Sequence, residues 1–254
     1  MTGMRGKRRA WGWAVVLFLA GCATTPYGAE PPGKAEDYYN LGVAYLNSGE
    51  PRRALPEFTR AIEMAPGQAP YHRGLGLAYY LDRNLPEAVA ALRRAVELDP
   101  KSSDALTDLG RAYLEQGDFA RAEQALKAAL ANSFYPTPHL AHFALGTVYQ
   151  QQARLEEAAA QFRRAVDVDP EFANAHNSLG IIYLAQNKLD LAIASFQTAS
   201  RLTPNVAIVY RNLGIAYVRA GRRAEARAAL EQAVKLQPAG PAADEIRDLL
   251  RRIR

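Results

Sequence analysis

Cysteine is almost absent from this sequence, because Cys22 is the only one among 254 residues. A single cysteine excludes an intramolecular disulfide, and with it any small scaffold that disulfides hold together. The chain therefore needs a hydrophobic core that is stable unaided, and the residues after Cys22 are numerous enough to supply one. With 49% apolar and 22% charged residues, the composition is that of a folded protein rather than a disordered one.

An excess of positive charge is also missing from most of the chain. The formal net charge is +5, from 31 basic and 26 acidic residues. Four basic residues stand before a short hydrophobic stretch that no acidic residue precedes, namely Arg5, Lys7, Arg8 and Arg9. Without these four, 27 basic residues remain against 26 acidic ones. The basic balance therefore indicates a targeting segment and does not support nucleic-acid binding.

Signatures of catalysis are lacking as well. The sequence has no serine nucleophile elbow, no glycine loop for phosphate and no paired carboxylates outside its repeats. His72 and His176 occupy equivalent repeat positions where large packing residues are usual, so we expect them to be buried at helix interfaces. His139 and His142 have helical spacing, but no cysteine or carboxylate lies near them in the sequence to complete a metal site. We therefore expect no enzymatic activity, no metal and no cofactor.

The chain begins with a basic segment and then a short apolar one. Arg5 to Arg9 precede the eleven residues Ala10–Ala20, which have the sequence AWGWAVVLFLA. A permanent membrane span needs about 20 apolar residues, so this stretch is too short to be one. The order of charge and hydrophobicity predicts a signal peptide over residues 1–21.

The apolar stretch ends in Leu19-Ala20-Gly21-Cys22, which resembles the lipobox of bacterial lipoproteins. The resemblance implies cleavage before Cys22 and lipidation of its thiol, and two or more acyl chains give stable anchoring. The alternative is an ordinary secretory signal with an incidental cysteine. No aspartate follows Cys22, which favours lipid anchoring at the periplasmic face of the outer membrane in a Gram-negative host.

Residues 23–34 contain three prolines and two glycines without apolar periodicity. Together with the lipidated residue, we expect 22–34 to be a flexible tether, reaching at most about 40 Å.

Most of the remaining sequence is a repeat. Six Leu-Gly pairs, from Leu41-Gly42 to Leu213-Gly214, are spaced by 34, 34, 36, 34 and 34 residues. Each glycine is followed by Tyr after three residues, by Ala after twelve and by Phe or Leu after sixteen. This pattern resembles the tetratricopeptide repeat, a helix-turn-helix unit of 34 residues. The resemblance implies an all-α, right-handed superhelical solenoid with repeats at 35–68, 69–102, 103–138, 139–172, 173–206 and 207–240.

Both ends of this array have features of their own. Residues 241–254 are expected to form a C-terminal capping helix, because Ile246, Leu249, Leu250 and Ile253 share one helical face. In repeat 1, Pro56 falls inside the second helix, so we expect that helix to be kinked or to start late.

In the tetratricopeptide family the first helix of each repeat lines a concave groove, which implies a partner-binding site here. Its residues are more apolar than the charged clamp that some family members use for acidic peptides, which favours an apolar strand or amphipathic helix as the partner. Alternatively, the apolar residues are partly structural. The implied groove residues are Tyr39, Val43, Leu46, Asn47, Arg73, Leu77, Tyr80, Leu81, Thr107, Arg111, Leu114, Phe143, Thr147, Gln150, Asn177, Ile181, Leu184, Arg211, Ile215, Val218 and Arg219.

The 36-residue spacing marks an irregular junction after the third repeat. This junction carries Phe134-Tyr135-Pro136 and two extra residues. A lipoprotein with six repeats and such a junction is similar to the type IV pilus biogenesis pilotins of the PilF/PilW family. The resemblance implies a scaffold that binds secretin subunits and promotes their outer-membrane targeting or multimer assembly. The alternative function is a general outer-membrane adaptor that gathers peptidoglycan enzymes or another envelope complex. The alternative for the junction itself is a tolerated loop insertion.

Overall fold

The computed structural model describes residues 33–253, which form helices and the turns between them. The predicted signal peptide, Cys22 and all but the last two residues of the predicted tether lie outside the described residues. Within 33–253 no helix has the length and apolar character needed to cross a membrane. The helices are α1 (Ala35–Asn47), α2 (Pro51–Met64), α3 (Ala69–Leu81), α4 (Leu85–Leu98), α5 (Ser103–Glu115), α6 (Phe119–Leu130), α7 (Pro138–Gln151), α8 (Leu155–Val168), α9 (Ala173–Ala185), α10 (Leu189–Leu202), α11 (Ala207–Arg219), α12 (Arg223–Leu236) and α13 (Pro241–Arg252).

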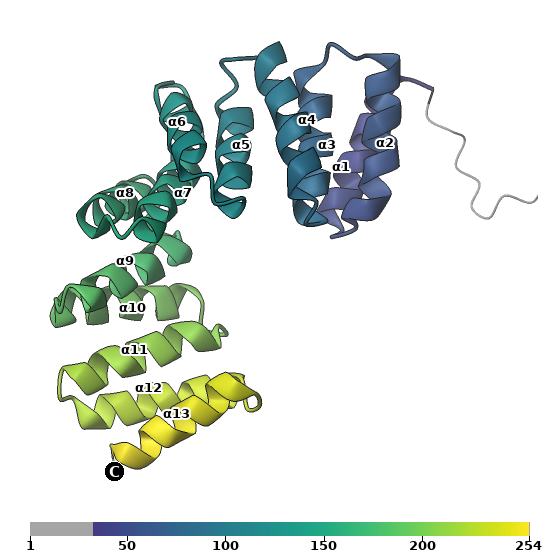
Figure 1. Ribbon diagram of the computed structural model, residues 1–254. Helices are drawn as coiled ribbons and strands as arrows, with labels where there is room; N and C mark the ends of the chain where they lie inside the picture. The colour runs from purple at the N-terminus through teal and green to yellow at the C-terminus, as the bar shows by residue number, and fades with distance from the viewer. Residues whose placement is uncertain (1–32, 254) are drawn as a thin grey trace, which may run out of the picture. The chain divides into compact units, whose positions relative to one another are not determined.

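The helices pack in the order of the chain, as Figure 1 shows. Six pairs, from α1 with α2 to α11 with α12, each form one repeat, and the second helix of a pair packs against the first helix of the next. The final helix α13 packs on α12, where Ile246 joins Leu230 and Ala233 in a buried cluster. The predicted all-α solenoid of six helix-turn-helix repeats with a capping helix is confirmed.

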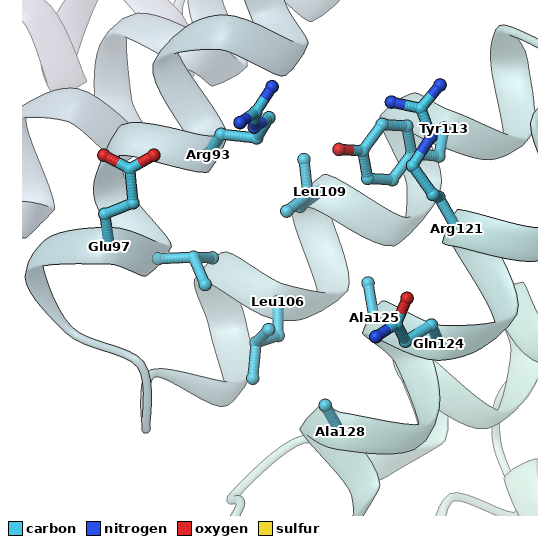
Figure 2. A pocket seen from close by; sticks show the side chains of 10 residues that line it. Arg93, Glu97, Leu106, Leu109, Tyr113, Arg121, Gln124, Ala125 and Ala128 are labelled. Atoms are coloured by element: carbon cyan, nitrogen blue, oxygen red, sulfur yellow. The ribbon is translucent and has the colours of Figure 1, made fainter.

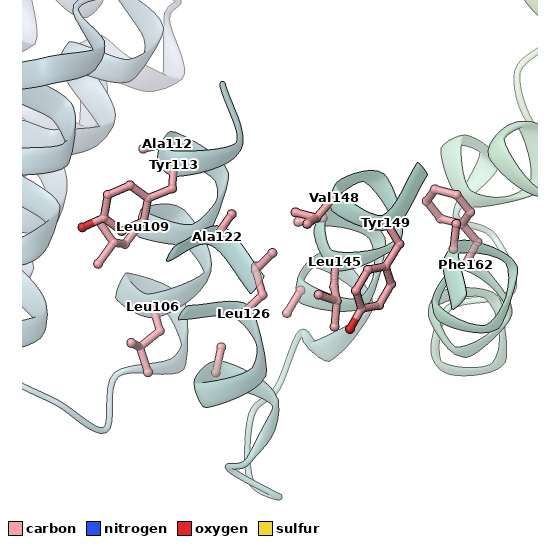
Figure 3. Close-up of a cluster of buried hydrophobic side chains, with 14 of the residues drawn as sticks. Leu106, Leu109, Ala112, Tyr113, Ala122, Leu126, Leu145, Val148, Tyr149 and Phe162 are labelled. Carbon is pink, nitrogen blue, oxygen red and sulfur yellow. The ribbon is translucent and has the colours of Figure 1, made fainter. Parts of the chain in front are cut away.

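The Leu-Gly pair explains why the two helices of a repeat lie so close. A Cβ atom added to Gly146 of α7 would lie 2.7 Å from the Phe162 ring of α8, well inside van der Waals contact. Phe162 is fully buried, and the alanine four residues before it, Ala158, is fully buried too. Figure 3 shows part of this core, to which α5, α6, α7 and α8 contribute. The small residues therefore set the helix spacing that the large residues fill.

The turns inside the repeats use a left-handed residue after the first helix. Gly117 and Gly221 take φ of 77° and 74° there, as is usual for glycine at this place. Arg83, Ala153 and Asn187 take φ of 64°, 58° and 59° at the equivalent turns without being glycine. The repeat geometry thus imposes the same backbone at these turns whether or not the residue favours it.

Pro56 does not delay its helix. Helix α2 begins at Pro51, which is at its first position, and continues through Pro56 to Met64. Proline at the first position removes no helical hydrogen bond, whereas Pro56 in the second turn removes one, the bond to the carbonyl of Arg52. The expected late start is therefore wrong, because one missing bond does not outweigh the packing of Ala54, Phe58 and Ala61, which are fully buried.

The expectation for His72 and His176 was wrong in degree, because both are half-buried rather than buried. The Nε2–H of His72 donates to the carbonyl oxygen of Pro66 at 2.9 Å, and His176 makes the same bond to Pro170 at 2.9 Å. Each ring thus ties the start of a repeat to the end of the preceding one. The accepting residues Pro66 and Pro170 are exposed, so a ring that reaches them keeps part of its surface in solvent.

Candidate protein-binding groove

The predicted groove residues lie on the first helices α1, α3, α5, α7, α9 and α11, and nearly all are half-buried. Each therefore gives part of its surface to the core and leaves part open to solvent. Asn47, Leu81 and Arg219 are exposed. Thr107 is 3% exposed, so its prediction as a groove residue is wrong.

In repeats 1 and 2 the groove side is aromatic. The Tyr39 ring stacks on that of Tyr71 with centroids 5.0 Å apart, and it also lies 5.9 Å from the Phe58 ring. Val43 and Leu46 pack against the same buried Phe58 cluster. These apolar residues are thus partly structural, and only their outer edges can meet a partner.

A charged cluster follows where α3 meets α5. The Nε of Arg73 lies 2.7 Å from Oδ2 of Asp108, and Asp104 lies 3.7 Å from the same guanidinium. Arg111 approaches Asp108 from its own helix at 3.6 Å. Asp108 is only 7% exposed; its burial raises the pKa of its carboxyl, and the two guanidinium groups limit that rise. The groove is thus less uniformly apolar than the sequence indicates.

An apolar pocket of about 350 Å³ lies beside this cluster, between α3, α5, α7 and the start of α9. Five of the residues that line it are predicted groove residues, namely Tyr80, Arg111, Leu114, Phe143 and Thr147. Leu140 and Phe172 also line it, and the Phe172 ring meets that of Phe143 edge-on at 5.1 Å. The structure therefore concentrates part of the predicted groove into one recess.

Arg111 forms the polar edge of this pocket. Its guanidinium lies over the Tyr80 ring, 5.2 Å from the centroid. Glu115 and Asn174 add an acceptor and an amide to the lining. An apolar wall with a few convergent polar groups is the usual form of a recognition site for a side chain and its adjoining backbone.

Further along, the predicted residues mostly connect repeats to one another. Asn212 donates to Asn177 at 3.1 Å, and Arg211 pairs with Glu245 of the capping helix at 2.8 Å. Ile181 and Leu184 pack against the adjoining buried cluster. Leu77 and Ile215 are half-buried like the others but do not line the pocket.

The junction after α6 separates its two aromatic residues. Phe134 is 91% exposed, whereas Tyr135 is 6% exposed and joins the buried cluster around α5 and α7. The side chain of Asn132 donates to the Ser103 hydroxyl at 3.0 Å and accepts from the backbone N–H of Phe134 at 3.0 Å. Pro136 is exposed. The insertion is thus a braced structure with one aromatic side chain inward and one outward.

Sequence reasoning missed three contributors to the groove side. Leu140 stands at the second position of its repeat, a groove position in the family, and that position was the available signal. Phe172 precedes α9 and Asp108 faces α3 from the next repeat, so neither carries a local signal. Among residues 33–253 no group of three or more histidine, cysteine, aspartate or glutamate side chains is placed to hold a metal ion.

Comparison with known protein families gives one consistent result. Models described as tetratricopeptide repeat match residues 39–103 and 143–207, and further models of the same description match 79–133 and 179–251. A comparison by sequence with curated proteins finds no match.

Solved structures share the fold at low sequence identity. PilF of Pseudomonas aeruginosa is 19% identical with a TM-score of 0.76, over 85% of this chain and 97% of that one. PilW, a widely conserved type IV pilus biogenesis factor, is 18% identical with a TM-score of 0.77, over 84% and 97%. Cut9, in its complex with Hcn1 from the APC/C, is 20% identical with a TM-score of 0.75, over 87% and 43%. At these identities the similarity establishes the fold alone.

Proposed function

This chain belongs to the tetratricopeptide repeat family, and we propose that it is a type IV pilus pilotin, a lipid-anchored scaffold that binds secretin subunits. In this proposal the chain is not an enzyme, and it promotes outer-membrane targeting of the secretin or assembly of its multimers. Its lipid is attached at Cys22 and holds the repeats at the periplasmic face of the outer membrane.

The observation that carries this proposal is the match in extent with PilF and PilW. This chain covers 97% of each of those two solved chains, but only 43% of the similarly scoring Cut9. The shared helical array therefore has the extent of the whole PilF and PilW chains but of less than half of the Cut9 chain. The lipobox-like Leu19-Ala20-Gly21-Cys22 supports the membrane attachment.

The pocket beside Arg111 supplies the physical role. Secretin subunits expose apolar membrane strands and unpaired strand edges before they assemble, and both promote aggregation. A half-buried aromatic recess can hold an apolar side chain of such a strand, while Arg111 and Asn174 meet its polar backbone. A lipid anchor raises the effective concentration of this site at the membrane where secretins insert.

The test is the secretin multimer in a strain that lacks this chain. Heat-resistant secretin multimers should be lost or strongly reduced on deletion and restored by the wild-type chain. The Cys22→Ser chain should restore them poorly, because it lacks the anchor. Unchanged multimers after deletion would reject the pilotin proposal.

A pair of leucine variants locates the binding surface. Leu140 lines the pocket and is 39% exposed, so Leu140→Asp places a charge there with little cost to folding. Leu191 on α10 is 51% exposed and lies away from the pocket, which makes Leu191→Asp the matched control. We expect the first variant to fail in restoring multimers and the second to succeed. Co-purification with peptidoglycan enzymes in place of a secretin would favour the general adaptor.

A further inference from the structure

One position of the repeat carries an aromatic or imidazole ring in five repeats and not in the third. This ring position lies four residues before the glycine of each Leu-Gly pair. Its occupants are Tyr38, His72, Leu106, His142, His176 and Tyr210.

Four of these rings contact the second helix of their own repeat or the turn that ends the preceding one. His72 and His176 donate to the turn carbonyls of Pro66 and Pro170, each at 2.9 Å. The His142 ring hydrogen-bonds Gln161 at 2.8 Å, and the guanidinium of Arg60 lies 5.6 Å from the centroid of the Tyr38 ring. In repeats 1 and 4 a long side chain of the repeat's own second helix thus lies against the ring.

The third repeat has neither the ring nor the long side chain seen in repeats 1 and 4. Leu106 replaces the ring, and α6 places Ala125 and Ala128 where repeat 1 has Glu57 and Arg60. A cavity of about 360 Å³ results, with α5 as its floor and α4 and α6 as its walls. Figure 2 shows Leu106 and Leu109 on the floor between the charged rim of α4 and the alanines of α6.

The charged residues at the rim of this cavity restrict the ligands that it can bind. Glu97 pairs with Arg94 at 3.1 Å, and Arg121 pairs with Asp118 while lying over the Tyr113 ring at 4.9 Å. Arg93 lines the same rim from α4 and has no ion pair within residues 33–253. The rim therefore has one guanidinium that is not neutralised by a neighbouring carboxylate.

We propose that this cavity is a second binding site, which accepts an aromatic side chain of a partner protein with an acidic residue beside it. The aromatic side chain takes the place of the ring that the third repeat lacks, and the acid pairs with Arg93. Floor and walls are apolar where the ring would lie, so burial of an aromatic group is the main attraction.

This site is separate from the groove. Leu106, Leu109 and Tyr113 are spaced by three and four residues and share one face of α5. The groove residues Arg111 and Leu114 lie on a different face of the same helix, toward α3 and α7. The proposal does not depend on secretin binding, so the chain can hold two partners or two parts of one.

Short capped peptides test the cavity directly, with the methyl NMR signals of Leu106, Leu109 and Ala128 in the purified protein as the readout. N-acetyl-Phe-Asp-amide should shift these signals saturably, with a dissociation constant of about 1 mM for a ligand of this size. N-acetyl-Phe-Lys-amide should bind about threefold more weakly, because it cannot pair with Arg93. N-acetyl-Ala-Asp-amide should give no saturable shift.

Two variants close the cavity in different ways. Leu106→His restores the ring, which can donate to the Pro100 carbonyl, and Ala128→Arg restores the long side chain. Both should abolish peptide binding, whereas Thr198→Arg at the equivalent position of repeat 5 should not. Arg93→Gln should remove the preference for Asp over Lys.

The contrary results are equally definite. Absence of saturable shifts in the wild-type protein, or binding that survives both closing variants, would overturn the proposal.

Phe134 of a second copy of this chain is the competing occupant of the cavity, because it is 91% exposed, and it has no acidic neighbour in the sequence. Concentration-dependent dimers in sedimentation, lost in both Phe134→Ala and Leu106→His, would assign the cavity to self-association instead. None of these results depends on secretin multimers, so failure here is distinguishable from failure of the pilotin proposal.

Discussion

The hydroxyl groups of Thr107 and Tyr135 lie 3.0 Å apart, and both residues are buried. Thr107 is on α5, at a repeat position that faces the groove in the family, and Tyr135 belongs to the insertion after α6. The insertion therefore folds back over the third repeat and covers one groove position. It leaves the neighbouring pocket at Leu114 and Phe143 open.

Removing the Tyr135 hydroxyl should destabilise the protein. Tyr135→Phe leaves the buried Thr107 hydroxyl without its partner, which costs about 1–2 kcal/mol. Urea unfolding followed by circular dichroism measures the change. Phe134→Ala is the control, expected to change stability by less than about 0.5 kcal/mol because its side chain is exposed. Equal effects of the two variants would contradict the inward placement of Tyr135.

A methyl group at Gly146 should be poorly tolerated. Gly146→Ala brings a Cβ to 2.7 Å from the Phe162 ring, so the helices must separate or the ring must move. Such overpacking costs about 1–3 kcal/mol. Thermal unfolding of both variants measures this, and Gly67→Ala, where no atom lies within 4 Å of the added Cβ, should be nearly neutral. A neutral Gly146→Ala would show that α7 and α8 are less closely packed than described.

Glycine at the turn after α7 should stabilise the protein. Ala153 has φ of 58°, which strains a residue with a Cβ, so Ala153→Gly should add about 0.5–1 kcal/mol after the greater entropy of unfolded glycine is subtracted. Gly117→Ala, at the equivalent turn with φ of 77°, should change stability in the opposite direction. Relative to the wild-type protein, the unfolding midpoint should therefore rise in Ala153→Gly and fall in Gly117→Ala. A shift of both midpoints in one direction would contradict backbone strain at Ala153.

The carboxylate of Glu123 should make stability depend on pH. Partial burial opposes its ionisation, but hydrogen bonds from Lys127 at 2.6 Å, Tyr149 at 3.0 Å and Arg154 at 3.0 Å outweigh this and lower its pKa. Because the folded-state pKa is lowered, the stabilisation is present above the ordinary glutamate pKa and is lost as the pH falls through the folded-state value.

The expected window is from about pH 5 downward, and Glu123→Gln should flatten the decline of the unfolding midpoint there. Glu231→Gln on the exposed side of α12 is the control, since no ion pair is found for Glu231 within residues 33–253. An unchanged pH profile in Glu123→Gln would show that the network does not hold the carboxylate in its ionised form.

The helical array could be predicted from the sequence, whereas the details of its surface could not. The Leu-Gly period and the small and large residues at fixed intervals act within one repeat, so they specify its helix pair locally. The hydrogen-bond partner of the buried Asp108 carboxylate is Arg73, which lies 35 residues away. The pocket likewise needs Leu140 and Phe172 to meet Tyr80 from two repeats earlier.

The contacts made at the ring position could not be predicted from the sequence either. His72 and His176 were recognised as equivalent, yet their bonds to turn carbonyls determine their half-buried state, and those bonds are visible only in three dimensions. His142 occupies the same position, but from the sequence only its helical spacing from His139 was noted. In the structure His142 bonds Gln161, while the His139 ring meets Phe172 edge-on at 5.3 Å.

Site-specific photocrosslinking in cells tests secretin binding by the groove most directly. A photoreactive phenylalanine analogue at Leu140 places the crosslinker at the pocket, and the same analogue at Leu191 places it on an exposed site of α10. Secretin binding by the groove predicts a chain–secretin adduct from position 140 and none from position 191. Absence of the adduct at 140, in a strain whose secretin multimers still require this chain, would contradict it.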